Sequence, residues 1–214
     1  MSALEKFIQI KAIVNSLSPI NTTLIVVTKS HKIDKINSII EYGHNEFGEN
    51  RVSEALEKWS KIKEKNLKIK LHLIGRLQSN KVANACQIFD YIHSLDSEKL
   101  ASKISFEQNK IKKSIKLFIQ VNIGNESQKS GIIISALDDF VKLCVTKYKL
   151  DIIGLMCIPP INQDPIPYFR LLKQLALNNG LPELSMGMSS DYLKAIECGS
   201  SYVRIGSAIF GERN

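Results

Sequence analysis

The sequence has few of the residues that build disulfide frameworks and metal centres. Its four cysteines, at positions 86, 144, 157 and 198, lie far apart and contain no C-x-x-C pair, so neither a disulfide scaffold nor a zinc finger is indicated. The four histidines include no H-E-x-x-H motif and no pair four residues apart. We therefore expect no metal site, and the cysteine pattern favours a reducing, cytoplasmic environment.

Long apolar runs are also missing. No segment approaches the roughly 18 consecutive apolar residues that a membrane-spanning helix needs, and charged residues interrupt the first segment, which argues against a secretory signal. We expect no membrane partner. Instead, apolar residues of the first segment recur at helical spacing, which predicts an amphipathic helix packed on a core: Ala3, Phe7, Ile10, Val14 and Leu17.

The chain carries a formal net charge of +8 at pH 7 but lacks the arrangement that nucleic-acid binding requires. Nucleic-acid binding needs basic residues gathered on one face, with aromatic side chains between them. Here the lysines are densest in 58–70 and 109–116, where they are spread along predicted helices and the loops that follow. We interpret them as solvated helix faces and expect no nucleic-acid partner.

Short apolar runs alternate with segments of helical period along the whole chain. The runs lie at 24–28, 46–48, 71–75, 91–95, 117–122, 152–156, 184–187 and 202–206, and no Pro-, Gly- or Ser-rich linker divides them. This alternation predicts βα units in one domain over 1–214, and eight parallel strands close a (β/α)8 TIM barrel. A doubly wound open sheet is the alternative, but its first strand usually precedes a glycine-rich turn, where this chain reads TKSHK.

Two loops of the predicted barrel are suited to binding phosphate. In such barrels the active face lies at the C-terminal ends of the strands, and the loops after strands seven and eight commonly hold phosphate. Here those loops read SMGMSSDYL, with Ser189, Ser190 and Asp191, and RIGSAIFG, with Gly206 and Ser207. Each loop alone also fits ordinary helix capping. Because the two loops are neighbours in a closed barrel, we expect them to form one phosphate cup.

Lys29 follows the first predicted strand, which neighbours the eighth once the barrel closes. Alternation places Lys29 on the same strand face as Ile25 and Val27, so its ammonium points inward if they do. A lysine desolvated there has a lowered pKa and can attack an aldehyde to form a Schiff base. The alternative is a solvated lysine at the end of a strand.

Arg204 lies inside the last predicted strand, between Val203 and Ile205. If these two neighbours face the outer helices, Arg204 faces the lumen, where it needs either a core carboxylate or a ligand atom as acceptor. In a pyridoxal phosphate site that acceptor is the pyridine nitrogen. An arginine keeps its proton, so it leaves the nitrogen unprotonated and makes the ring a weak electron sink.

The sequence resembles the pyridoxal phosphate homeostasis proteins, also called the proline synthetase co-transcribed family, from end to end. The resemblance is carried by VVTKSH, EFGENRVSEALEKW, HLIGRLQSNK, QVNIGNESQKSGI, GLMCIPP and SMGMSSDYLKAIECGSSYVRIGSAIFG. It implies pyridoxal 5'-phosphate as the cofactor and a fold similar to the N-terminal barrel domain of alanine racemase, the third fold type of pyridoxal phosphate proteins. It also implies cofactor-binding roles for six residues: Lys29 as the Schiff-base lysine, Arg204 beside the pyridine nitrogen, Asn50 near the cofactor, and Ser189, Gly206 and Ser207 on the phosphate.

The resemblance implies a carrier rather than a catalyst. Related racemases have a C-terminal β domain that supplies a catalytic tyrosine, whereas this sequence stops at FGERN soon after the last predicted strand. Two-base racemisation then lacks a second acid or base. We therefore expect a protein, monomeric or weakly dimeric, that maintains the vitamin B6 pool and the balance of amino acids and keto acids, with pyridoxal phosphate-dependent apoenzymes as candidate partners.

Two enzyme classes remain as alternatives. The first is a pyridoxal phosphate-dependent racemase, for which Tyr192 and His72 are the candidates for the opposing acid or base. The second is a Schiff-base aldolase or phosphosugar enzyme, which would share the lysine and the phosphate cup. Two further positions bear on the resemblance: Lys129, in QKSGI, lies in a loop that suggests a second aldehyde contact, and His31 stands where family members often have a second lysine.

Overall fold

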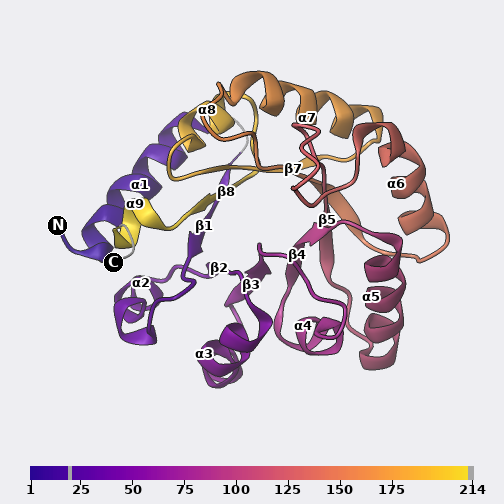
Figure 1. Ribbon diagram of the computed structural model, residues 1–214. Coiled ribbons are helices and arrows are strands. Elements are labelled where there is room, and N and C mark those ends of the chain that lie inside the picture. The colour runs from indigo at the N-terminus through magenta and orange to yellow at the C-terminus, as the bar shows by residue number, and fades with distance from the viewer. Residues whose placement is uncertain (19–20, 212–214) are drawn as a thin grey trace.

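The computed structural model describes residues 1–18 and 21–211. Eight parallel strands form a closed barrel in chain order, and β8 pairs with β1 to complete it (Figure 1). The strands are β1 (Thr23–Val27), β2 (Glu46–Glu49), β3 (Lys70–Leu73), β4 (Tyr91–Leu95), β5 (Lys116–Gln120), β6 (Ile152–Met156), β7 (Glu183–Met188) and β8 (Tyr202–Ile205). The predicted (β/α)8 barrel is confirmed, and the open sheet is wrong.

Helices surround the barrel, and α1 packs against α8 and α9 (Figure 1). The helices are α1 (Ala3–Leu17), α2 (Asn37–Glu41), α3 (Val52–Lys65), α4 (Val82–Ile88), α5 (Glu98–Ile111), α6 (Leu137–Thr146), α7 (Ile166–Asn178), α8 (Tyr192–Glu197) and α9 (Ser207–Phe210), with 3-10 turns η1 (Ile33–Lys35) and η2 (Ile134–Ala136). Their apolar faces cover the outside of the strands, so the main core is the layer between barrel and helices.

Helix α1 begins with a capping box. The Ser2 hydroxyl accepts from the Glu5 backbone N–H at 3.2 Å, and the Glu5 carboxylate accepts from the Ser2 N–H at 2.8 Å. Three members of the predicted stripe are buried, Phe7, Ile10 and Val14, and Ala3 packs partly against the same core. Leu17 at the end of the stripe is half exposed instead, because it is the last residue of the helix.

Successive residues of the strands separate into an outer and an inner set. Leu24 and Val26 belong to the core beneath the helices, whereas Ile25 and Val27 are buried outside that core. A Cβ atom built on Gly48 would lie 2.9 Å from Ile25 Cγ2 and 3.6 Å from Val27 Cγ2, so these residues meet inside the barrel. The first strand therefore presents the face that continues to Lys29 toward the lumen.

The observed strands begin and end within two residues of the predicted ones. The largest differences are at the C-terminal ends of β3 and β5, where the apolar run continues into a loop after the pairing has stopped. Ile74 after β3 lines a cavity, and Val121 after β5 is buried, which explains why the pattern overruns the strands.

The four cysteines are all free and buried. Within residues 1–18 and 21–211, no group of three or more His, Cys, Asp or Glu side chains is arranged to hold a metal ion. In the same part of the chain, every helix is too short or too polar to cross a lipid bilayer.

Candidate functional site

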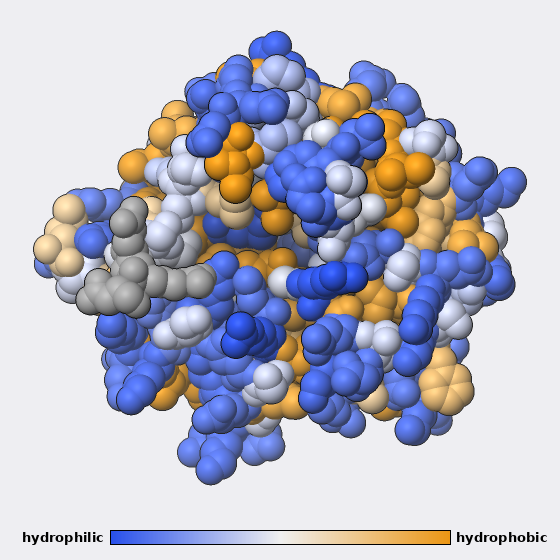
Figure 2. Space-filling view, in the orientation of Figure 1, coloured by the Kyte–Doolittle hydropathy of each residue, from blue (hydrophilic) through white to orange (hydrophobic). Residues whose placement is uncertain are grey.

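A cavity of about 340 Å³ opens at the C-terminal ends of the strands. Figure 2 shows that the face in view is hollowed near its centre, inside the ring of helices. The six residues expected to bind a cofactor all line this cavity: Lys29, Asn50, Ser189, Arg204, Gly206 and Ser207. The rest of the lining is Val27, His31, Ile74, Ile158, Met188, Ser190 and Gly211. The closed barrel therefore brings together residues from the two ends of the sequence.

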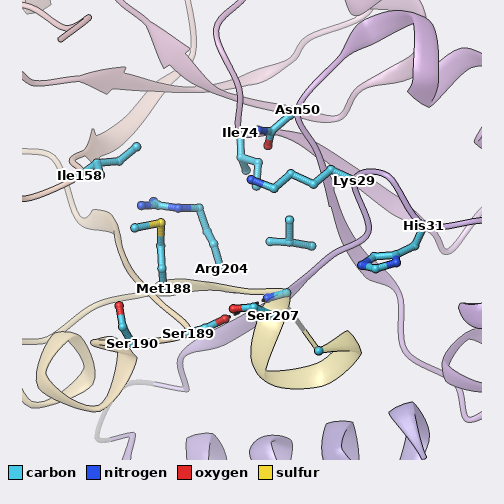
Figure 3. A pocket seen from close by; sticks show the side chains of 13 residues that line it. Lys29, His31, Asn50, Ile74, Ile158, Met188, Ser189, Ser190, Arg204 and Ser207 are labelled. Carbon is cyan, nitrogen blue, oxygen red and sulfur yellow. Dashed lines mark hydrogen bonds between the residues drawn. The ribbon is translucent and has the colours of Figure 1, made fainter. Parts of the chain in front are cut away.

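Lys29 enters the cavity from the turn after β1. Figure 3 shows its side chain running toward Ile74 and Asn50. The next residue, Ser30, has a φ of 65° and its backbone N–H donates to Glu54 of α3 at 2.5 Å. Because a non-glycine residue in the left-handed region needs support from its surroundings, this contact helps to define the path of the turn.

A buried carboxylate lies directly behind this turn. The Glu49 Oε1 atom accepts hydrogen bonds from Thr28 Oγ1 at 2.7 Å, Lys58 Nζ at 2.8 Å and Trp59 Nε1 at 2.9 Å. Lys58 also donates to the Thr28 carbonyl at 2.8 Å and to Glu54 at 2.9 Å. The residue before Lys29 is thus fixed to both β2 and α3.

Arg204 is 5% exposed, points into the lumen and lines the cavity. Its Nη1 donates to the Ser185 carbonyl at 2.8 Å and to Ser185 Oγ at 2.6 Å, and its Nη2 donates to the Cys157 carbonyl at 3.0 Å. Its neighbours Val203 and Ile205 belong to the outer core, as the alternation predicts. All three acceptors are neutral, so within the described residues no core carboxylate is paired with this guanidinium. Burial lowers the pKa of Arg204, but a guanidinium remains protonated at neutral pH.

The loops after β7 and β8 are joined by one hydroxyl. Ser189 Oγ accepts from the backbone N–H groups of Gly206 and Ala208, both at 3.3 Å. A Cβ atom on Gly206 would lie 3.1 Å from both the Cβ and the carbonyl oxygen of Val27, so a glycine lets the β8 loop approach β1. Figure 3 shows Ser189 and Ser207 together on one side of the cavity. Because Ser189 Oγ accepts both bonds, its own hydrogen is left to donate, and it can serve a single anionic group together with the Ser207 hydroxyl.

The capping alternative for the β7 loop does not hold for its side chains. Asp191 occupies the position before α8, but its carboxylate makes no capping hydrogen bond to that helix; Oδ1 accepts instead from the Met188 backbone N–H at 2.6 Å, which closes the loop on itself. Ser189 and Ser190 line the cavity. The loop therefore turns two hydroxyls toward the cavity and uses Asp191 to stabilise its own path.

Three residues considered in the sequence lie away from the cavity. Lys129 forms an ion pair with Glu126 at 2.6 Å and donates to the Pro159 carbonyl at 3.2 Å. Tyr192 and His72, the candidates for an opposing acid or base, are not among the lining residues, and His72 lies deep in the barrel. His31 does line the cavity, and its ring packs against Phe210 with centroids 4.5 Å apart.

Comparison with known proteins identifies the family of this chain. The family model described as "Alanine racemase, N-terminal domain" matches residues 8–214. A pyridoxal phosphate homeostasis protein of Aquifex aeolicus is 38% identical over 202 residues, which cover 89% of this chain and 86% of the relative. The protein of that name from Escherichia coli K12 is 34% identical over 206 residues, or 92% and 88% of the two chains. This chain belongs to the pyridoxal phosphate homeostasis protein family.

Solved structures agree with membership of the homeostasis protein family. PipY of Synechococcus elongatus, solved with PLP bound, has a TM-score of 0.86 and 31% identity, covering 98% of this chain and all (100%) of that one. Alanine racemase of Corynebacterium glutamicum has a TM-score of 0.73 and 16% identity, and covers 98% of this chain but only 62% of its own. The second likeness shows the fold alone.

Sequence reasoning missed the apolar wall and the support behind the site. Val27, Ile74, Ile158 and Met188 form that wall, and all lie at or just after the C-terminal ends of strands. The inward phase of each strand, carried past its end, is a signal that would have found several of them. For Glu49 the signal is a carboxylate in an otherwise buried strand.

Proposed function

We propose that this chain binds pyridoxal 5'-phosphate in the cavity at the C-terminal ends of the strands, attached to Lys29. The observation that carries the proposal is the convergence of Lys29, Arg204 and the β7 and β8 loops on one cavity. The family of homeostasis proteins, and the relative solved with PLP bound, support it. When bound, the cofactor supplies an aldehyde that condenses with a lysine amine and a pyridine ring that accepts electron density.

The donor set of the cavity fits this cofactor. Lys29 supplies the amine, and the hydroxyls of Ser189 and Ser207 supply donors for the phosphate, beside the N–H of Gly206, which in this structure donates to Ser189 Oγ. Arg204 supplies a cation held by neutral acceptors, which suits a neutral pyridine nitrogen. Asn50 lies beside the Lys29 side chain, where its amide orients the amine or the ring (Figure 3).

We also propose that the protein stores and delivers the cofactor without catalysing turnover of amino acids. An arginine at the pyridine nitrogen retains its own proton, so the ring stabilises carbanions poorly. Within the described residues, the titratable side chains that line the cavity are Lys29, His31 and Arg204, and neither Tyr192 nor His72 reaches it. A carrier needs a covalent anchor and a phosphate cup, and Lys29 with the β7 and β8 loops on one cavity supports this proposal.

The setting of this function is part of the proposal. We propose a cytoplasmic protein that maintains vitamin B6 together with amino-acid and keto-acid balance, whose partners are pyridoxal phosphate-dependent apoenzymes. The proposed state is a monomer or weak dimer, with no nucleic-acid partner, no membrane partner and no metal. The single domain over 1–214 includes residues 19–20 and 212–214, which lie outside the described part of the chain.

The test is an absorbance spectrum of the purified protein, with and without added pyridoxal phosphate, followed by borohydride reduction and peptide mapping. We expect a band near the visible edge, fixed by reduction on the peptide that contains Lys29 and missing in Lys29→Ala. Lys32→Ala is the matched control, because Lys32 is an exposed lysine of the same loop. A wild-type protein that stays colourless with excess cofactor would overturn the proposal.

A further inference from the structure

A continuous chain of hydrogen bonds crosses the barrel from the cavity to its opposite mouth. Arg204 Nη1 donates to Ser185 Oγ at 2.6 Å, and Ser185 Oγ lies 2.8 Å from His93 Nδ1. His93 Nε2 lies 3.0 Å from His72 Nδ1, and His72 Nε2 lies 2.7 Å from Glu46 Oε2. We call these five residues the lumen chain. It links β8 and β7, near the end of the chain, to β4, β3 and β2 in its first half.

The lumen chain is buried along its length and open only at its far end. His72, His93 and Ser185 have no exposed surface, whereas the Glu46 side chain is 29% exposed at the start of β2. Two aromatic rings hold the histidine planes: His93 stacks on Phe118 and His72 stacks on Tyr91, each pair with centroids 4.3 Å apart. The rings therefore have little freedom to rotate away from their hydrogen-bond partners.

The two ends of the lumen chain determine the direction of every bond. A guanidinium only donates, and Ser185 has no other acceptor for its hydroxyl hydrogen among the described residues, so that hydrogen goes to His93 Nδ1. A carboxylate only accepts, so His72 Nε2 carries a hydrogen toward Glu46. The remaining bond joins the two rings: His93 Nε2 carries a hydrogen and donates it to His72 Nδ1, which carries none. Each histidine thus holds one hydrogen, on Nε2, and no two donors face each other.

The electrostatics agree with single protonation of His93. Burial, together with the nearby His72 and Arg204, lowers the pKa of His93 well below its ordinary value. A neutral His93 is what the direction of the chain requires. The buried guanidinium is therefore connected, through neutral groups, to the carboxylate of Glu46 at the other mouth.

The same geometry limits which Arg204 hydrogens remain for a ligand. Both Nη1 hydrogens are used on Ser185, and one Nη2 hydrogen is used on the Cys157 carbonyl. The Nε hydrogen and the second Nη2 hydrogen have no acceptor among the described residues. Because these bonds fix the plane of the guanidinium, the orientation of the two remaining donors depends on Ser185, which takes both Nη1 hydrogens, together with the Cys157 carbonyl.

We propose that Ser185, His93 and His72 are positioning residues that hold the Arg204 guanidinium in a single orientation toward the cofactor's ring, through the one-directional chain that ends on Glu46. The proposal rests on the proposed function, since it takes Arg204 to face pyridoxal phosphate. None of the three residues lines the cavity, so each acts only through Arg204.

The first arm of the test needs no cofactor. Nitrogen-15 NMR distinguishes a protonated from a bare nitrogen in a histidine ring. The sample is folded apoprotein at neutral pH. We expect His72 and His93 both to carry their hydrogen on Nε2. A hydrogen on Nδ1 of either ring would overturn the direction of the chain and with it the proposal.

The second arm compares two variants of nearly equal shape, Ser185→Thr and Ser185→Val. They differ only in that valine has a methyl group where threonine has a hydroxyl. We expect Ser185→Val to bind pyridoxal phosphate roughly tenfold or more weakly than Ser185→Thr, as the loss of a hydrogen bond to a charged group predicts. We also expect the absorbance band to shift in Ser185→Val alone, because the orientation of the donor at the ring changes. Equal affinities and equal bands in the two variants would overturn the positioning role.

Ser200→Ala is the control for stability. Ser200 is another fully buried hydroxyl between β7 and β8, and it donates to the Met186 carbonyl at 2.7 Å without touching the lumen chain. We expect its loss to lower the thermal midpoint and leave the cofactor's affinity and band unchanged. If wild-type protein shows both expected tautomers but binds no cofactor, the positioning role falls together with the proposed function. If the tautomers differ from those expected and the cofactor binds normally, the positioning role falls and the proposed function stands.

Discussion

Glu49 and Lys58 form a buried ion pair of 2.8 Å behind the turn that carries Lys29. The Glu49 side chain has no exposed surface and that of Lys58 is 9% exposed, so both charges have lost most of their hydration. Lys58 also donates to the carbonyl of Thr28, the residue before Lys29. The pair therefore joins the stability of the fold to the placement of the proposed anchor.

Removal of one partner of this pair should be costly. In Lys58→Met the Glu49 carboxylate stays buried but loses its cationic partner. Its Oε2 atom already lacks a hydrogen-bond partner among the described residues. We expect the free energy of unfolding to fall by about 3–5 kcal/mol. Urea denaturation measures it. The control is Glu49→Gln combined with Lys58→Met, which removes both charges and should regain part of the loss; a single variant as stable as wild type would contradict the assignment.

Acid should destabilise the protein in a defined pH window through its buried histidines. Burial lowers the pKa of His44 from 6.5 to about 4, and the pKa of His93 is also lowered. The unfolded chain therefore binds more protons than the folded one below pH 6.5, and stability falls as the pH drops toward about 4. Each such histidine contributes a slope of up to about 1.4 kcal/mol per pH unit.

A histidine variant tests that slope. We expect His44→Gln to be less stable than wild type at pH 7, because its contact with the Glu46 carbonyl at 2.9 Å is altered, but to lose less stability between pH 6.5 and pH 4. Urea unfolding at several pH values measures both. Parallel stability curves for the two proteins would show that His44 does not titrate as inferred.

The glycine at the end of β7 should be irreplaceable for a steric reason. Gly187 has a φ of 92°, and a Cβ atom there would lie 2.5 Å from the Ala195 Cβ of α8. Gly180 also has a positive φ, 64°, but open space around it, so it is the matched control for backbone strain alone. We expect Gly187→Ala to lose about 1–3 kcal/mol more than Gly180→Ala in thermal or urea unfolding. Equal losses would mean that α8 moves freely.

Much of this fold follows from one-dimensional patterns. The strands were predicted because parallel strands buried on both faces produce continuous apolar runs, and alternation alone placed Lys29 and Arg204 on the inner face. The eight-strand count then made β1 and β8 neighbours, which brings Lys29 near the phosphate loops. The roles of these residues toward a cofactor remain proposals, because geometry brings groups together without stating what they bind.

Other features could not be predicted, because they depend on registers and docking angles. Glu49 meets Lys58 only once α3 has docked on β2, and the sequence gives no measure of that angle. His72 meets His93 and Ser185 through the register of strands that are far apart in the chain. The isolated histidines therefore suggested no site, although two of them are joined in the lumen.

The hydroxyl that joins the β7 and β8 loops should control recognition of phosphate in particular. Ser189 Oγ accepts from two backbone N–H groups of the β8 loop, so Ser189→Ala releases the loop and removes a donor from the proposed cup. We expect affinity for pyridoxal phosphate to fall roughly tenfold, whereas affinity for pyridoxal, which lacks the phosphate, should change little. The measurement is a titration of both compounds by absorbance. If both affinities fell equally, Ser189 would support the whole cavity rather than the phosphate, and the cup would have to be placed elsewhere on the rim.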